Sequence, residues 1–324
     1  MVKVVTAGMS EEDGDFCVGV CLQVFLTTIL VTCTICIYGT IIPIKYSYSS
    51  VSGMLHAMLF GVLITLMVAS YLKTWLSDPG TVTRDWSPPK EIASELEEEG
   101  GVKSSQSQFC KRCKIQRPPR SAHCRQCGKC VLRMDHHCPW VQNCVGAANH
   151  KFFFLFLFYG TITSLYYSIM TFIFLAHVLE QHLMLQQLGT WMGVVLGMLI
   201  LVLVLSMMQG GLCIWNGFLI LKNQTATENY ELDSIASKNR NSKKKVKVTH
   251  KYDVGWYRNT QSVMGDNPAY WLLPLGIVRT DGLSMGDLGR DAVELQPLKE
   301  VEGTEQSSSP FAPLSPRTAD AHVA

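Results

Sequence analysis

The chain has 324 residues, of which 48% are hydrophobic and only 17% are charged, and its mean hydropathy is +0.16. This composition is too apolar for an ordinary soluble domain. The formal net charge of +2 is small because basic and acidic segments nearly cancel, and nothing in the charge pattern indicates a nucleic-acid partner.

Four long apolar stretches account for this composition. Each has few or no charges and reaches the roughly 20 residues that a helix needs to cross a hydrocarbon core about 30 Å thick. Core helices of a large soluble protein are the alternative, but such helices rarely lack a charged face. The stretches are Cys17–Ile44, Met54–Leu76, Phe152–Val178 and Trp191–Leu221. We therefore predict an α-helical integral membrane protein with four transmembrane helices.

The basic residues predict which side of the membrane each loop occupies. Of the 28 Lys and Arg residues, twelve lie between Arg84 and Lys151 and thirteen follow the fourth stretch, whereas the two short loops hold one between them. Basic loops stay in the cytosol, so both termini and the long middle loop are expected to be cytosolic. The first stretch lacks the features of a cleaved signal peptide. We expect a multi-pass protein of the Golgi or endoplasmic reticulum, with the plasma membrane as the alternative.

The same stretches divide the chain into seven predicted segments. These are a cytosolic lead (1–16), the first two helices (17–77), a polar linker (78–108), a cysteine-rich module (109–151), the last two helices (152–221), an ordered cytosolic tail (222–278) and a disordered C-terminus (279–324). Asp78-Pro79-Gly80 is expected to end the second helix.

The middle loop carries a dense cluster of metal-binding residue types. Seven cysteines and three histidines lie between Cys110 and Cys144, with three C-x2-C spacings. A two-residue gap lets two thiolates bind one metal, and mixed Cys₃His ligation is typical of structural zinc. Disulfides are disfavoured in the reducing cytosol. Two zinc sites need eight ligands, so the ten candidates leave one cysteine and one histidine over.

The run Asp135-His136-His137-Cys138 indicates what the surplus residues do. In an extended segment successive side chains point to opposite faces, so an inward His137 leaves His136 and Cys138 together on the other face. An imidazole beside a free thiol favours a nucleophilic thiolate, and Asp135 is placed to orient that imidazole. Spacing alone also permits the alternative, in which His136 and Cys138 are metal ligands.

From Cys110 to Phe153 the chain resembles the Asp-His-His-Cys cysteine-rich domain of the protein S-acyltransferases, or palmitoyltransferases. The family pattern C-x2-C-x9-H-C-x2-C-x2-C-x4-D-H-H-C-x5-C-x4-N-x3-F is matched at every fixed position. Asp78-Pro79-Gly80 and the tail segment "YDVGWYRNTQSVMG" are further landmarks, and the resemblance covers residues 17–275. Two positions depart from the family: Ala226 in the Thr-Thr-x-Glu motif, and Met264, where an aromatic residue is common.

The resemblance implies two structural Zn²⁺ sites and a cysteine nucleophile. One site would use Cys110, Cys113, His123 and Cys130, and the other would use Cys124, Cys127, His137 and Cys144. It implies that Cys138 is the nucleophile, His136 its base and Asp135 the residue that orients His136. The implied reaction moves a long-chain acyl group, typically palmitoyl, from fatty acyl-CoA to cysteines of protein substrates at the cytosolic face. It would proceed in two stages through an acyl-enzyme on Cys138.

The membrane also constrains where the substrate binds. A long acyl chain in water is unfavourable by about 0.8 kcal/mol per CH₂, so we expect it among the helices and the membrane lipid. Trp140 and the aromatic start of the third helix are expected to line its path. The candidates for contact with the CoA phosphates, each of which alternatively faces solvent, are Arg117, Arg120, Arg133 and Lys151.

Two other classes of function are alternatives to acyl transfer. A membrane-anchored zinc scaffold would perform no chemistry and would take up no hydroxylamine-sensitive acyl label. A transporter is disfavoured because the apolar stretches contain no carboxylate or arginine. The sequence leaves open whether an accessory subunit takes part.

Overall fold

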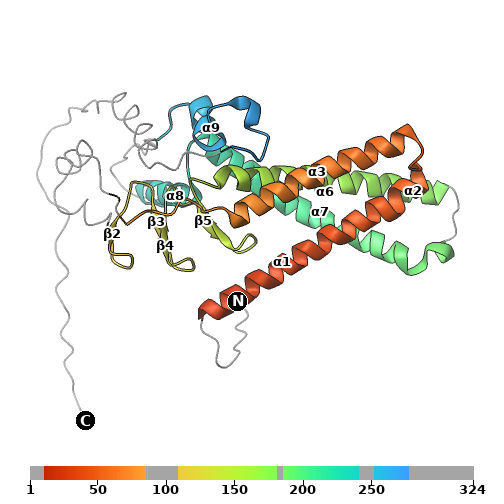
Figure 1. The fold of residues 1–324 in the computed structure, drawn as a ribbon, viewed down its shortest axis with the longest axis horizontal. Helices are drawn as coiled ribbons and strands as arrows, with labels where there is room; N and C mark the ends of the chain where they lie inside the picture. The colour runs from red at the N-terminus through yellow and green to blue at the C-terminus, as the bar shows by residue number, and fades with distance from the viewer. Residues whose placement is uncertain (1–10, 85, 87–108, 181–184, 241–251, 277–324) are drawn as a thin grey trace, which may run out of the picture.

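The computed structural model describes residues 11–84, 86, 109–180, 185–240 and 252–276 (Figure 1). Most of the predicted lead (1–16), nearly all of the predicted linker (78–108) after its first seven residues, and the predicted C-terminus (279–324) lie outside the described residues.

Among the described residues, four helical spans are long and apolar enough to cross a membrane, which confirms the predicted architecture. Their bounds are Cys17–Lys45, Val51–Leu76, His150–Glu180 and Trp191–Leu221. The first span consists of α1 (Glu11–Cys36), a short π-helical segment η1 (Ile37–Ile41) and α2 (Ile42–Lys45), and the other three lie in α3 (Val51–Leu76), α6 (His150–Glu180) and α7 (Leu185–Leu221). Ser50 caps α3, because its hydroxyl accepts a hydrogen bond from the Gly53 N–H at 3.0 Å.

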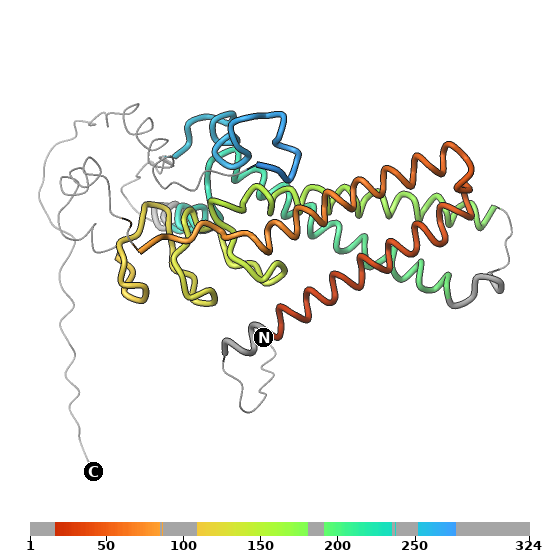
Figure 2. Tube along the Cα trace, viewed as in Figure 1, coloured from red at the N-terminus to blue at the C-terminus, as the bar shows by residue number. Residues whose placement is uncertain are grey.

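The long helix α6 lies at the centre of the bundle, where both α3 and α7 pack against it (Figure 2). The first span joins this core mainly near η1, where Cys36 and Ile37 pack beside Tyr167 and Phe174 of α6. Toward its N-terminus α1 runs at an angle to the other three helices, as Figure 1 shows. The first span therefore contacts the other helices mainly near η1 and diverges from their direction toward its N-terminus.

The cysteine-rich module lies at the N-terminal end of α6, between spans two and three, and consists of three small antiparallel hairpins. The strands are β1 (Phe109–Cys110) with β2 (Ile115–Gln116), β3 (Ala122–Cys124) with β4 (Lys129–Val131), and β5 (His136–Cys138) with β6 (Asn143–Val145). Isolated two-stranded hairpins are marginally stable in water at best. The module therefore needs cross-links and a rigid attachment to the helices.

Two polar residues attach the module to the end of α3. Asp78 accepts hydrogen bonds from the Gly80 and Thr81 N–H groups at 2.7 and 2.6 Å, which turns the chain so that Thr81 pairs with Val131. The Asn143 amide donates to the last carbonyls of α3 and to Ser77, at 2.8–3.1 Å. These bonds satisfy groups that a helix end leaves unpaired, so the β5–β6 hairpin and α3 are fixed together.

The tail forms α8 (Ala226–Arg240), α9 (Trp256–Met264) and the short 3₁₀ helix η2 (Pro268–Tyr270). Helix α8 lies beside the hairpins, whereas α9 packs on α6 and α7 (Figure 1). The Lys151 ammonium donates to the carbonyls of Tyr270 and Leu275, both at 2.8 Å. The part of the tail that the structure describes is therefore bound to the rest of the protein.

Candidate zinc-binding and active site

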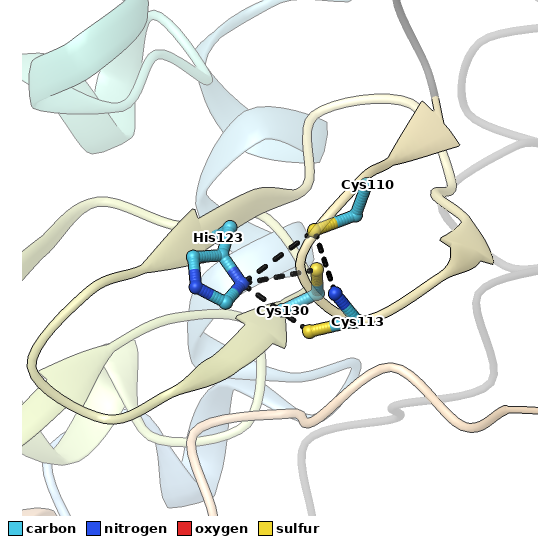
Figure 3. A group of neighbouring side chains, drawn as sticks. All are labelled: Cys110, Cys113, His123 and Cys130. Carbon is cyan, nitrogen blue, oxygen red and sulfur yellow. Dashed lines mark hydrogen bonds between the residues drawn. The ribbon is translucent and has the colours of Figure 1, made fainter.

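The first metal-binding group joins the turn of one hairpin to the strands of the next (Figure 3). Cys110 and Cys113 come from the β1–β2 hairpin, whereas His123 and Cys130 are directly opposed in the β3–β4 ladder. The His123 Nδ1 atom lies 3.6, 3.2 and 3.8 Å from the sulfur atoms of Cys110, Cys113 and Cys130. Four ligand atoms thus surround one point.

The second group repeats this construction one hairpin later. Cys124 and Cys127 belong to the β3–β4 hairpin, and His137 and Cys144 are opposed in the β5–β6 ladder. The His137 Nδ1 atom lies 3.6, 3.4 and 3.7 Å from the sulfur atoms of Cys124, Cys127 and Cys144. Each group therefore links two successive hairpins, and together the groups connect all three.

Both groups fit zinc in geometry and in donor chemistry. Tetrahedral Zn²⁺ with Zn–S of about 2.3 Å and Zn–N of about 2.05 Å places sulfur and nitrogen about 3.6 Å apart, close to the separations observed here. Burial and the thiols of Cys110 and Cys113 raise the pKa of Cys130 to about 12, and the Cys127 thiol together with burial raises the pKa of Cys144. A bound cation would hold these sulfur atoms as thiolates, because a thiol that coordinates a metal is deprotonated.

A 14-residue repeat explains why Cys138 belongs to neither group. Residues in equivalent positions are Cys110, Cys124 and Cys138, then His123 and His137, and then Cys130 and Cys144. A third group would need ligands at positions 141, 151 and 158, but these are Val141 at the hairpin turn and Lys151 and Phe158 in α6. Cys138 therefore has the position of a ligand without the partners. The repeat is a signal in the sequence that separates it from the ligands without knowledge of the family.

The Cys138 thiol lies in an apolar environment where the third hairpin meets the helices. Only 5% of the residue is exposed, and its neighbours in the buried cluster include Val141, Phe153 and Leu157. The Trp140 side chain packs against this cluster, as do side chains from α3, α6 and α7. A hydrocarbon chain attached to Cys138 would therefore contact apolar side chains at once.

The two residues before the zinc ligand His137 form a charged pair beside Cys138. The Asp135 carboxylate lies 2.7 Å from His136 Nδ1, and the His136 ring packs edge-on against Phe153. Burial opposes the charged imidazole, but hydrogen bonds to Asp135 and Cys138 outweigh it and raise the pKa of His136 to about 9. Burial favours a neutral Asp135, but the His136 hydrogen bond and nearby positive charge lower its pKa to about 2. The pair thus places a cationic imidazole next to the thiol.

Comparison with known proteins identifies this arrangement. A family model described as DHHC palmitoyltransferase matches residues 103–233. The protein named probable protein S-acyltransferase 15 of Arabidopsis thaliana is 34% identical over 227 residues, which are 69% of this chain and 85% of that protein. Probable protein S-acyltransferase 14 of the same plant is 31% identical over 280 residues, covering 81% and 80% of the two chains. Palmitoyltransferase ZDHHC15 of Rattus norvegicus is 33% identical over 185 residues, covering 54% and 49%.

The chain belongs to the DHHC palmitoyltransferase family. The expected family and enzyme class are thereby confirmed.

In this family member the tail contacts the Asp135–His136 pair through a hydrogen bond to Asp135. The Ala226 N–H, at the start of α8, donates to Asp135 Oδ1 at 2.6 Å. Glu228 accepts a bidentate hydrogen bond from Arg120 at 2.6 and 2.7 Å and also accepts the Thr225 N–H. The contribution of Ala226 comes from its backbone, which explains how alanine can stand where the family motif has threonine.

Breaking the Arg120–Glu228 pair is expected to destabilise the fold strongly. The Glu228→Ala variant leaves the Arg120 guanidinium, whose side chain is only 6% exposed, without its carboxylate. Removing one partner of a buried ion pair typically costs about 3–5 kcal/mol. Thermal unfolding of the purified protein measures this loss, with the exposed neighbour Glu231→Ala as the matched control. Equal melting temperatures for the two variants would show that the pair does not hold the tail.

The four basic residues predicted to contact CoA occupy different environments. Arg133 is 1% exposed and donates to Asn223, and Arg120 binds Glu228 and Asn223, so both guanidinium groups point into the protein. The Lys151 ammonium binds tail carbonyls. Arg117 is half-buried and donates to the Ser121 carbonyl at 3.3 Å. Arg133 is thus enclosed by the protein, and the other three basic groups each have a protein acceptor.

Proposed function

We propose that this palmitoyltransferase moves a long-chain acyl group from acyl-CoA to cysteine thiols of proteins, through an acyl-enzyme on Cys138. One observation carries the proposal. Six of the seven cysteines between Cys110 and Cys144 lie in the two metal-binding groups, and the seventh, Cys138, lies beside the His136–Asp135 pair against an apolar surface. A thiol that is withheld from metal and placed next to an imidazole suits nucleophilic catalysis.

In the first half-reaction the Cys138 sulfur attacks the thioester carbonyl carbon and the CoA sulfur leaves. His136 takes the thiol proton and, as a cation, stabilises the thiolate before attack; it then gives this proton to the departing CoA sulfur. The neutral imidazole accepts the proton of the incoming substrate thiol in the second half-reaction and returns it to the Cys138 sulfur when the acyl group leaves. Asp135 holds the His136 ring through Nδ1 and balances its charge, and the Ala226 N–H holds Asp135. A cysteine of the protein substrate then attacks the carbonyl carbon of the acyl-enzyme. This order of steps predicts ping-pong kinetics.

The two groups of four ligands would hold structural Zn²⁺. Each group has a full set of protein donors, so no position is left for a reacting water. The ion would supply folding free energy rather than chemistry. Because His137 and Cys138 are neighbours in β5, fixing the His137 ring also fixes the strand that presents the nucleophile.

The reaction would take place at the cytosolic surface of the membrane. We propose that both termini and the hairpin module are cytosolic, because the basic residues gather on those segments. The acyl chain would run from Cys138 among α3, α6 and α7, past Trp140 and Phe156, while the CoA moiety stays in the cytosol. Arg117 remains a candidate contact for a CoA phosphate. A Golgi or endoplasmic-reticulum location remains a proposal from the sequence.

The Ala226→Pro variant tests the support of Asp135 by a single backbone hydrogen bond. Ala226 is the first residue of α8, where proline is tolerated because its N–H makes no intrahelical bond. Proline therefore removes the donor to Asp135 while it preserves the helix. A hydrogen bond to a charged group is worth about 1.5–3 kcal/mol, so we expect the rate of acyl-enzyme formation to fall by about 10-fold or more. The Ala226→Ser variant, which keeps the N–H, should retain wild-type rates; if both variants react equally fast, the bond is unimportant.

The function itself is tested by incubating purified protein with palmitoyl-CoA that carries a labelled acyl chain. We expect a covalent label that hydroxylamine removes and that passes to an added cysteine-containing peptide. A zinc scaffold without chemistry would remain unlabelled, and that result would refute the proposed function.

A further inference from the structure

A pair of polar side chains from two different helices lies on the membrane side of Cys138. The Tyr71 hydroxyl, from α3, lies 3.5 Å from the Trp140 carbonyl oxygen, and its electrostatic neighbours include the Gln23 amide of α1 and the Cys138 thiol. Tyr71 also packs against the apolar cluster that contains Cys138. Among apolar side chains, these two groups supply hydrogen-bond donors next to the nucleophile.

Gln23 reaches this position because α1 approaches the active-site hairpin closely at one glycine. A Cβ atom on Gly19 would lie 1.5 Å from Gln142 Nε2, in the turn between β5 and β6. Gly19 and Gln23 are four residues apart and share one face of α1. Figure 1 shows this end of α1 near the β5 hairpin. A side chain at Gly19 would require the Gln142 side chain to move, so the glycine permits this close approach of α1 to the hairpin turn.

Both donors are only partly used. Gln23 Nε2 is buried and has no acceptor at normal hydrogen-bond geometry among the described residues. The contact from the Tyr71 hydroxyl to Trp140 is long at 3.5 Å. An unpaired buried amide N–H is costly, and more so inside a membrane span than in water. A buried donor without an acceptor at this position suits an acceptor that arrives with the substrate.

We propose that Gln23 and Tyr71 donate hydrogen bonds to the thioester carbonyl oxygen during acyl transfer. This inference rests on the proposed function. As the Cys138 sulfur bonds to the carbonyl carbon, an electron pair of the C=O bond moves onto the oxygen. The C–S bond to CoA then breaks, the CoA sulfur leaves with its electron pair, and the C=O bond forms again. Discharge of the acyl-enzyme by a substrate thiol passes through the same kind of oxyanion.

Donors directed at such an oxyanion typically accelerate a reaction by about 10²–10³-fold each. A residue that only bound the acyl-CoA would change KM and the first half-reaction alone. A residue that only joined α1 to α3 would change thermal stability and leave the carbonyl unaffected. Gln23 as an oxyanion donor instead slows both half-reactions at nearly constant KM.

The test uses full-length protein and single-turnover rates with labelled palmitoyl-CoA. In the Gln23→Leu variant, whose leucine suits a membrane span, we expect acylation and discharge each to slow by about 10²-fold, with unchanged zinc content. The Gln209→Leu variant of α7 is the matched control and should keep wild-type rates. The Gln209 amide already has an acceptor, because it lies 3.5 Å from a backbone carbonyl of α6. With a ¹³C-labelled carbonyl, the infrared band of the wild-type acyl-enzyme should lie at lower frequency than that of Gln23→Leu.

Wild-type rates or an unchanged carbonyl band in Gln23→Leu would overturn the inference. Tyr71→Phe keeps the packing of the ring and removes only the hydroxyl, so it gives a second reading if Gln23→Leu does not fold; it should move the band in the same direction. Wild-type protein that forms no acyl-enzyme would overturn the proposed function instead, so the two failures are distinguishable.

Discussion

Replacing Cys138 with serine is expected to abolish acyl transfer while both metal sites stay filled. Serine preserves the size of the side chain in its apolar environment, but its hydroxyl is a much weaker nucleophile than a thiolate. Loss of a nucleophile in a cooperating catalytic group is costly, so turnover should fall by at least about 10³-fold. The measurements are the transfer rate from labelled palmitoyl-CoA and the zinc content per chain.

The zinc content makes this experiment decisive about roles. Cys138 lies outside both groups of ligand atoms, and its equivalents in the repeat, Cys110 and Cys124, lie inside them. If Cys138→Ser lost zinc, the thiol would be a ligand, and the division of the cysteines into ligands and nucleophile would be wrong. The exposed Cys17 offers a control, since Cys17→Ser should change neither quantity.

Replacing Cys124 is expected to have the opposite pattern of effects. Cys124→Ser removes one ligand of the second group, which joins the β3–β4 hairpin to the β5–β6 hairpin. Structural zinc contributes about 10–16 kcal/mol of apparent binding free energy in small zinc domains, and hairpins of this size have little else to hold them. We expect about half of the zinc to be lost, the melting temperature to fall and activity to disappear with the fold.

This variant also separates structural from catalytic cysteines. Its loss of activity should follow its loss of zinc and of stability, whereas Cys138→Ser should lose activity alone. A Cys124→Ser protein that kept two zinc ions per chain and a wild-type melting temperature would contradict the proposed ligand set.

The parts of the molecule that depend on local chemistry were predictable from the sequence. The spans follow from length and apolarity, because lipid offers no partner to an unpaired backbone. The metal-binding groups follow from thiol spacing together with the family resemblance, and the structure assembles the same two sets of four residues. The alternation of side chains in β5 also placed His136 and Cys138 on the side opposite His137.

Contacts between distant segments were not predictable in this way. Arg120 and Arg133 looked like surface residues that could meet phosphate, but their partners Glu228 and Asn223 lie about a hundred residues away in the chain. No local spacing of residues in the sequence predicts such a pairing. The same holds for Gln23, the one amide side chain of the first apolar stretch, because its surroundings depend on how α1 meets the β5–β6 hairpin.

Direct detection of the acyl-enzyme tests whether Cys138 is the nucleophile. Purified protein is incubated briefly with palmitoyl-CoA, digested without reducing agent at low pH, and searched by mass spectrometry for acylated cysteine peptides. The chain has twelve cysteines, and we expect the earliest thioester to form on Cys138 and its acyl group to be transferred to a substrate thiol. A label that first forms on another cysteine, and that persists and is transferred in Cys138→Ser, would contradict it.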